Sequence, residues 1–247
     1  MDTVRSPVIA AEPVLRRLGA LRKLSAEGAA ALERAVRERI LRAAAGEDLI
    51  TEGDRPASVH MILSGWACRY KTLQDGRRQI VNFALPGETC DAHLYLLSDM
   101  DHSIGALTPV VYAEIERGRF EELVANDRTV AEAFWCETLV MNAIQREWAI
   151  NLGRRDALER VAHMFCEVFE RLRCVGLTEG TSCAFPVTQM DMADATGLSV
   201  VHLNRTLQEL RAARLITLRE RNLTINDLDG LRDAGLFNPN YLHLRQR

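Results

Sequence analysis

The 247-residue sequence lacks any long apolar run. No stretch of 18 or more consecutive apolar residues occurs, which excludes a helix that spans a membrane. Residues 1–15 combine acidic side chains with too short an apolar segment for a secretory signal peptide. We therefore expect a cytoplasmic protein that has no membrane partner.

Paired metal-binding or redox cysteines are also lacking. No two of the six cysteines are separated by two residues, the spacing found in zinc ribbons, thioredoxin-like sites and iron–sulfur clusters. In a cytosol they are most simply reduced thiols, several of which fill the core. The six are Cys68, Cys90, Cys136, Cys166, Cys174 and Cys183.

The common catalytic signatures are absent as well. The sequence has no G-x-S-x-G, Walker A or H-E-x-x-H motif. A metal site of the cupin kind needs clustered histidines and carboxylates, but of six histidines only His60 falls on a predicted strand. We therefore expect neither an enzyme nor a metal or cofactor site.

What the sequence does contain is a two-helix unit near its C-terminus. A short helix after Pro186 ends at Gly197, which supplies the positive φ of a tight turn. Ser199 then caps a second helix over 200–213, where Leu203, Leu207 and Leu210 share one face. Two helices joined in this way predict a helix-turn-helix, and the alternative is an ordinary helical hairpin.

The charge distribution favours nucleic acid as the partner of this unit. The whole chain has a net charge of −3, which argues against a protein that coats nucleic acid along its entire surface. Residues 196–225 nevertheless hold five arginines against Glu209 and Glu220, a local charge of +3. Such a patch suits contact with phosphates.

The N-terminal half predicts helix followed by antiparallel sheet. Residues 15–42 have helical periodicity, helped by Ser25 as a cap. Residues 47–116 alternate turn signals with β-branched and aromatic segments, and Asp75-Gly76 is the strongest hairpin turn. The best strand candidates are 59–63, 67–72, 79–84 and 110–115, which indicates a barrel or sandwich.

A long helix is predicted over 129–152, and residues 153–156 form the natural hinge to a further helix over 157–173. The long helix carries a heptad seam with polar members, which suits a register-setting dimer interface better than a closed core. The alternative is a core helix of a single domain. The predicted dimer interface consists of Phe134, Thr138, Met141, Gln145, Trp148 and Leu152.

Ordered sequence blocks carry a resemblance to one family. The blocks EGD (52–54), ILSG (62–65), DGRRQI (75–80) and FALPGE (83–88) resemble the β-roll of the Crp/Fnr transcription regulators, in order. Residues 198–207 resemble the family's recognition helix, and 215–218 with 223–225 its two-stranded wing. The resemblance implies an α+β fold: a β-roll domain like a cyclic-nucleotide-binding domain (14–126), a dimerisation helix (127–153) and a winged helix-turn-helix (154–247).

The resemblance also implies a homodimer on a palindromic DNA site, with RNA polymerase as a further partner. Arg205 suits the guanine edge, Asn204 adenine or a phosphate, and Val201 a thymine methyl group. Val200 and Val201 stand where the cyclic-AMP members have Arg and Glu, so their operator does not transfer. The predicted DNA contacts are Thr188, Gln189, Ser199, Val201, His202, Asn204, Arg205, Gln208, Arg211, Arg219 and Arg221.

The signal-binding part departs from the cyclic-nucleotide pattern. The family's Gly-Glu pair has become Asp91-Ala92, and the Arg that grips the cyclic phosphate has become His102. Asp91, Asp99 and Asp101 would repel a cyclic phosphate. We therefore expect a different small-molecule or redox signal. Alternatives are an effector-independent or a cyclic-nucleotide-responsive regulator, and neither haem on His93 or His102 nor a reactive Cys68 or Cys90 is favoured. The predicted pocket is Cys90, Asp91, His93, Leu94, His102, Ser103 and Met141.

Overall fold

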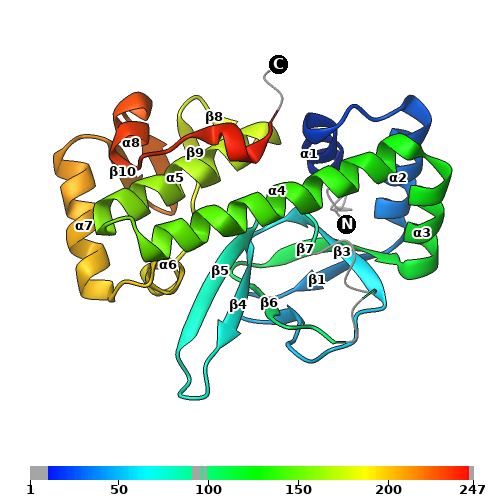
Figure 1. The fold of residues 1–247 in the computed structure, drawn as a ribbon, viewed down its shortest axis with the longest axis horizontal. Coiled ribbons are helices and arrows are strands. Elements are labelled where there is room, and N and C mark those ends of the chain that lie inside the picture. The colour runs from blue at the N-terminus through cyan, green and yellow to red at the C-terminus, as the bar shows by residue number, and fades with distance from the viewer. Residues whose placement is uncertain (1–10, 91–95, 97–98, 245–247) are drawn as a thin grey trace, which may run out of the picture.

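Helix α4 (Arg128–Gly153) runs through the middle of the molecule and contacts the N-terminal helices, the β-sheet region and the C-terminal part (Figure 1). The structure is a computed structural model that describes residues 11–90, 96 and 99–244. Two sheets lie along one side of α4, three helices cluster at its N-terminal end, and the C-terminal helical part packs at its other end (Figure 1). None of the described helices is long and apolar enough to cross a membrane.

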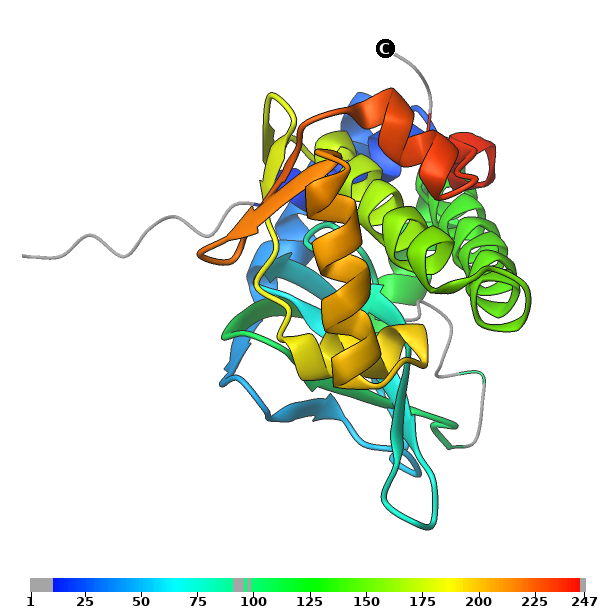
Figure 2. The same cartoon turned by 90° about the vertical axis from the view of Figure 1, so that its left-hand side faces the viewer.

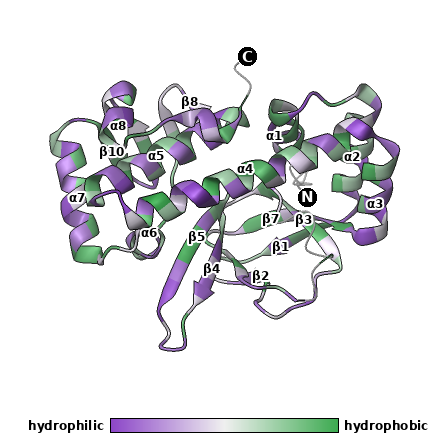
Figure 3. Ribbon diagram, in the orientation of Figure 1, coloured by the Kyte–Doolittle hydropathy of each residue, from purple (hydrophilic) through white to green (hydrophobic). Residues whose placement is uncertain are grey.

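The β-roll consists of two antiparallel sheets around an apolar interior that includes Ile62, Ile104 and Tyr112. The four predicted strands are confirmed as β3, β4, β5 and β7, whereas β1, β2 and β6 were not predicted. The β4–β5 hairpin projects from the body and is hydrophilic (Figure 3). The first sheet has the order β1 (Ile40–Ala43), β7 (Val110–Glu116), β3 (Ser58–Ser64), and the second β2 (Asp48–Ile50), β6 (Ser103–Ala106), β4 (Ala67–Thr72), β5 (Arg78–Ala84).

The helical structure expected over 15–42 is confirmed in two helices, but the expectation is wrong from Ile40 onward. The chain forms α1 (Glu12–Leu21) and α2 (Ala26–Glu38), and residues from Ile40 onward enter β1, where Ile40 pairs with Ala113. Ser25 caps α2 as predicted: its hydroxyl accepts the Gly28 amide at 2.8 Å and donates to the Asp127 carboxylate at 2.5 Å. These bonds cap α2 and tie it to the start of α4, beside α3 (Arg117–Asn126).

The predicted dimer seam on α4 is wrong for three of its six residues. Phe134, Met141 and Trp148 are buried in the chain's own core and are not available to a second chain. Gln145 is half-buried and donates to the carbonyl oxygen of Val81 at 3.3 Å. Thr138 is half-buried, and only Leu152 is exposed. The large apolar side chains that α4 leaves exposed are Trp135, Leu139, Ile150 and Leu152.

Helix α5 (Ala157–Cys174) returns beside α4 through a tight joint at residues 154–156. The Arg155 side chain donates to Asn151 at 2.9 Å and to Glu147 at 3.0 Å, and Asp156 forms a capping box with Glu159. These bonds brace the predicted hinge. A single apolar cluster runs from β4 and β5 through α4 and α5 into the C-terminal part, so the expected boundary at residue 154 does not separate two cores.

The C-terminal part has the predicted helix-turn-helix with a larger wing than expected (Figure 2). The hairpin of β10 and β11 extends into a four-stranded sheet of order β10-β11-β9-β8 instead of a two-stranded one. Figure 2 shows α7 lying across the front of the molecule, with the wing beside its C-terminal end. The elements are β8 (Thr178–Glu179), β9 (Ser182–Ala184), α6 (Gln189–Thr196), α7 (Val200–Ala212), β10 (Ile216–Arg219), β11 (Asn222–Ile225), α8 (Leu228–Ala234) and a 3₁₀ turn (Pro239–Leu242).

Candidate DNA interface

Local capping fixes the angle between α6 and α7. Thr188 begins α6 with a capping box, its hydroxyl accepting the Asp191 amide at 3.1 Å. Gly197 ends α6 at φ +65°, and a Cβ there would lie 3.2 Å from a methyl carbon of Leu152. Ser199 caps α7 as predicted by accepting the His202 amide at 3.2 Å. The second helix of the motif therefore starts from a rigid turn.

Helix α7 buries one face and exposes the predicted polar one. Leu203, Leu207 and Leu210 are buried against the domain core. Val201 is 66% exposed, although it is apolar. The outward stripe follows a spacing of three or four residues, so its members lie along one side of the helix. It consists of Val201, Asn204, Arg205, Gln208 and Arg211, which are all exposed except the half-buried Asn204.

Asn204 has a partner that the sequence did not suggest. Its side-chain amide donates to the side-chain oxygen of Gln189 at 3.1 Å, which links α7 to α6. The two predicted contact residues thus form one polar pair across the helix-turn-helix. No described residue donates to the side-chain carbonyl oxygen of Asn204, so this oxygen can accept a hydrogen bond from a base.

Five arginines near α7 and the wing form no ion pair with any residue that the structure describes. Elsewhere arginines have carboxylate partners, as in Arg22–Glu132 and Arg119–Glu38. Exposed guanidinium groups without counter-charges attract phosphate, which they bind in bidentate fashion. The five are Arg205, Arg211, Arg214, Arg219 and Arg221; all but Arg214 were predicted contacts, and the sequence signal for Arg214 was its place in the local +3 charge.

The surface that carries these arginines also contains residues in left-handed backbone conformations. Arg214 has φ +58° after the end of α7, and Glu220 and Arg221 have φ +49° and +60° in the two-residue wing turn. These left-handed conformations favour glycine or asparagine, because a Cβ crowds the backbone there. The wing turn thus presents the Arg221 side chain at a cost in local stability.

The helix-turn-helix is fastened to the β-roll by ion pairs. Arg78 on β5 bonds to Asp191 and, at 2.8 Å, to Asp194 of α6, while Gln79 donates to the Asp194 carbonyl oxygen at 2.6 Å. Deeper in the molecule, the Arg171 guanidinium of α5 donates hydrogen bonds to both carboxylate oxygens of Glu88, at 2.6 and 2.8 Å. Although burial raises the pKa of Glu88, the Arg171 guanidinium outweighs this and lowers that pKa below its ordinary value.

The described members of the predicted signal pocket have different surroundings. Cys90 is buried inside the β-roll, and Met141 packs in the core that α4 shares with α5, so the two belong to different apolar clusters. His102 is half-buried, with its Nδ1 at 2.7 Å from the Asp101 carboxylate. The buried Ser103 hydroxyl accepts the Glu52 amide at 2.9 Å. The other predicted members, Asp91, His93 and Leu94, lie outside the described residues.

Cys68 is not suited to redox sensing. It is buried, and this burial raises the pKa of its thiol to about 12. A reactive cysteine needs the opposite environment, because the thiolate is the species that reacts.

Comparison with known proteins identifies the family to which this architecture belongs. Residues 40–127 match the family model of the cyclic nucleotide-binding domain, and residues 159–234 match that of the Crp-like helix-turn-helix domain. The nitrogen fixation regulation protein FixK of Bradyrhizobium diazoefficiens is 33% identical over 184 residues, which cover 74% of this chain and 76% of FixK. The chain belongs to the Crp/Fnr family of transcription regulators.

Other members of the Crp/Fnr family are similar over the same extent. The transcriptional activator protein FnrL of Cereibacter sphaeroides is 27% identical over 187 residues, covering 74% of this chain and 75% of FnrL. The structure of FixK2 from Bradyrhizobium japonicum has a TM-score of 0.70 at 24% identity and covers 79% of this chain and 96% of its own. The family confirms the α+β fold expected from the sequence: a β-roll domain and a helix-turn-helix domain.

Proposed function

We propose that this Crp/Fnr-family regulator binds a palindromic DNA site as a homodimer and reads bases through α7. The observation that carries the proposal is that Arg205, in the outward stripe of α7, is exposed and forms no ion pair within the described part of the chain. Arg205 would bind the O6 and N7 atoms of guanine, Asn204 an adenine edge, and Val201 a thymine methyl group. Gln189, fixed to Asn204 at 3.1 Å, would hold that amide in place.

The dimer contact belongs to the exposed face of α4. Leu139 is 63% exposed and Trp135 61%. With Asn142, Arg146 and Ala149 they alternate at four and three residues, the seam spacing of paired helices. A polar residue such as Asn142 within an apolar seam sets the register between two helices. A second copy of this chain would cover this face and place two α7 helices on one DNA duplex.

Selection from a random DNA library, followed by binding measurements on the selected site and on a random duplex, tests base reading. Arg205→Ala is expected to remove roughly 1–3 kcal/mol of discrimination per half-site. Arg34→Ala removes the same charge from an exposed, unpaired position on α2 and serves as the control. An equal loss on both duplexes would show that Arg205 contacts phosphate instead of a base.

Sedimentation of Leu139→Asp tests the dimer face. A buried carboxylate at the centre of an apolar interface is strongly unfavourable, so the variant is expected to sediment as a folded monomer. Leu177→Asp makes the same change at an exposed leucine far from α4 in sequence and is expected to remain a dimer. A dimeric Leu139→Asp protein would contradict the assignment of this face.

The signal belongs to a class other than cyclic AMP. The described residues do not fit a cyclic phosphate, because His102 stands in place of the arginine and its ring is bonded to the Asp101 carboxylate. Adding cyclic AMP to the protein–DNA binding assay is expected to leave the affinity unchanged. A gain of roughly fivefold or more, the lower end of ordinary allosteric coupling, would overturn this part of the proposal.

A further inference from the structure

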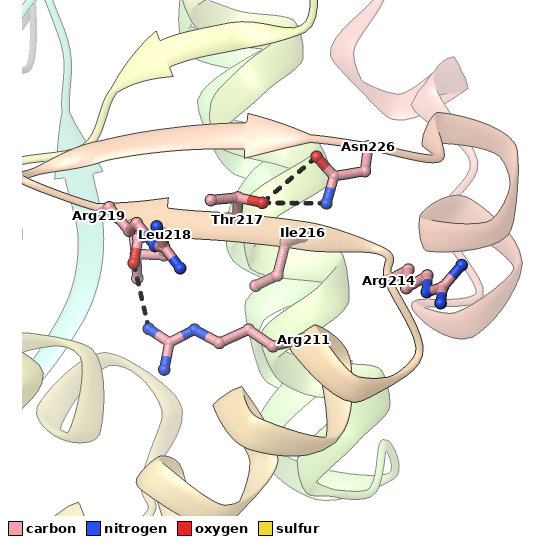
Figure 4. A pocket seen from close by; sticks show the side chains of 7 residues that line it. All are labelled: Arg211, Arg214, Ile216, Thr217, Leu218, Arg219 and Asn226. Carbon is pink, nitrogen blue, oxygen red and sulfur yellow. Dashed lines mark hydrogen bonds between the residues drawn. The ribbon is translucent and has the colours of Figure 1, made fainter.

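A pocket of 650 Å³ lies between the C-terminal end of α7 and the wing. Its floor is Ile216 and Thr217 on β10, and Thr217 is held by the Asn226 side chain at 3.1 Å (Figure 4). Arg211 and Arg219 lie together at one end and Arg214 at the other (Figure 4). The pocket is thus a trough with cationic side chains at both ends.

No residue that the structure describes neutralises the positive charge of this trough. Its lining contains no carboxylate, and none of its three arginines forms an ion pair with a described residue. Arg211 donates one hydrogen bond, to the Leu218 carbonyl oxygen at 3.3 Å, which orients its guanidinium across the trough (Figure 4). An oriented guanidinium with free donors is a binding group for phosphate oxygens.

Arg214 occupies a position where local structure favours glycine. It follows α7 in a Schellman motif: its amide donates to the Arg211 carbonyl oxygen, and the Leu215 amide donates to that of Leu210. The residue in this place must have positive φ, which costs an arginine of order 1 kcal/mol relative to glycine. Arg214 lines the end of the trough in spite of this cost.

The position of the trough indicates what it binds. Base edges are contacted by the N-terminal part of a recognition helix, so the C-terminal end of α7 lies nearer the sugar–phosphate backbone. Arg211 is also the last member of the outward stripe of α7, which connects the trough to the base-reading surface. Charges at both ends of a trough suit an extended polyanion better than a single small anion.

We propose that the trough holds backbone phosphates of DNA beyond the bases that α7 reads, with Arg214 as a phosphate ligand. This inference rests on the proposed function, in which α7 reads a palindromic site. It adds Arg214 to the contacts and extends the bound DNA past each half-site.

The salt dependence of DNA binding by Arg214→Gly tests the proposal. The substitution removes the guanidinium and relieves the positive φ, so the fold is retained. Each lost phosphate contact lowers the slope of log affinity against log salt by about 0.9, or about 1.8 for a dimer. Over a fourfold rise in salt the wild-type protein should therefore lose about 12-fold more affinity than the variant. Arg34→Ala is the control for charge alone, and its slope should match that of the wild type.

Duplex length separates this inference from the proposed function. On duplexes shortened stepwise at both ends, the wild type should lose its advantage over Arg214→Gly once the flanking phosphates are gone. Equal slopes for the two proteins on long duplexes would overturn the inference while selective binding of the wild type still supported the proposed function. If inorganic pyrophosphate bound the wild type but not Arg214→Gly by calorimetry, with those slopes equal, the trough would belong to a free phosphate ligand.

Discussion

Replacing Arg171 by Met is expected to be among the most destabilising changes outside the apolar core. The Arg171 side chain is fully buried and makes five hydrogen bonds: two to Glu88 and one each to Glu167, Asn82 and the Phe83 carbonyl oxygen. Methionine fills much of the volume but leaves two buried carboxylates without their cation. Breaking a buried ion pair by removing one partner costs about 3–5 kcal/mol, so we expect a loss of that size in the free energy of unfolding.

Urea unfolding followed by tryptophan fluorescence measures this loss, because Trp66 and Trp148 are buried in the shared core. Arg173→Met is the control on the same helix, since Arg173 pairs with Glu170 from a side chain that is 53% exposed. Glu170 is buried but keeps its ion pair with Arg232 at 2.8 Å, and the Arg173 side chain is half in solvent, so this variant should lose at most about 1 kcal/mol. Equal losses for the two variants would refute the view that Arg171 holds the domains together. The double variant Arg171→Met, Glu88→Met should regain part of the loss, because it removes one stranded carboxylate.

Three further changes test the polar contacts between elements. Hydrogen bonds from Ser25 and Thr129 lower the pKa of Asp127 to about 2, so its stabilisation is present above the ordinary value of 3.8 and is lost as pH falls toward 2. Asp127→Ala removes the cap of α4 and should cost about 1 kcal/mol in thermal unfolding at pH 7. The same variant should weaken the acid dependence below pH 4. Burial raises the pKa of Glu137 to about 7, so the free energy of unfolding should fall as pH rises from 4.5 to 7, and titrated urea unfolding of Glu137→Gln should lack that slope. Arg78→Ala should increase hydrogen exchange in α6 without changing exchange in α2, and unchanged exchange in α6 would show that the Asp194 pair does not hold that helix.

Local sequence patterns predicted elements whose signals lie within one segment. The helix-turn-helix was predictable because Gly197 and Ser199 mark its turn and cap, and the buried leucines of α7 keep a helical period. Strands β1, β2 and β6 are only three or four residues long, too short to show alternation. Ser25 was predictable as a cap, but its bond to Asp127, about a hundred residues away in sequence, was not, because no local pattern reports such a contact.

The error in the dimer seam has a related physical cause. Helix α4 carries apolar residues on two faces, and both follow a spacing that suits paired helices. The face with Phe134 and Trp148 contacts the chain's own core, while the neighbouring face with Leu139 remains exposed. Helical periodicity predicts which residues share a face but not what each face contacts, since that depends on how the β-roll and α5 pack against α4. For the same reason the sequence predicted the outward stripe of α7 correctly, because only one of its faces is apolar.

Residues other than glycine that have a positive φ point to functional positions that hydrophobic periodicity does not reveal. Five described residues other than glycine have positive φ, and three of them, Arg214, Glu220 and Arg221, lie on the basic surface beside α7. A sequence optimised for stability alone would place glycine or asparagine there. Strain of this kind persists where the side chain is used, and two of these three side chains are arginines without counter-charges. Arg214→Gly and Arg221→Gly should therefore each raise the thermal unfolding temperature while weakening DNA binding. If a variant neither gained stability nor lost affinity for DNA, the left-handed backbone at that position would have no connection with function.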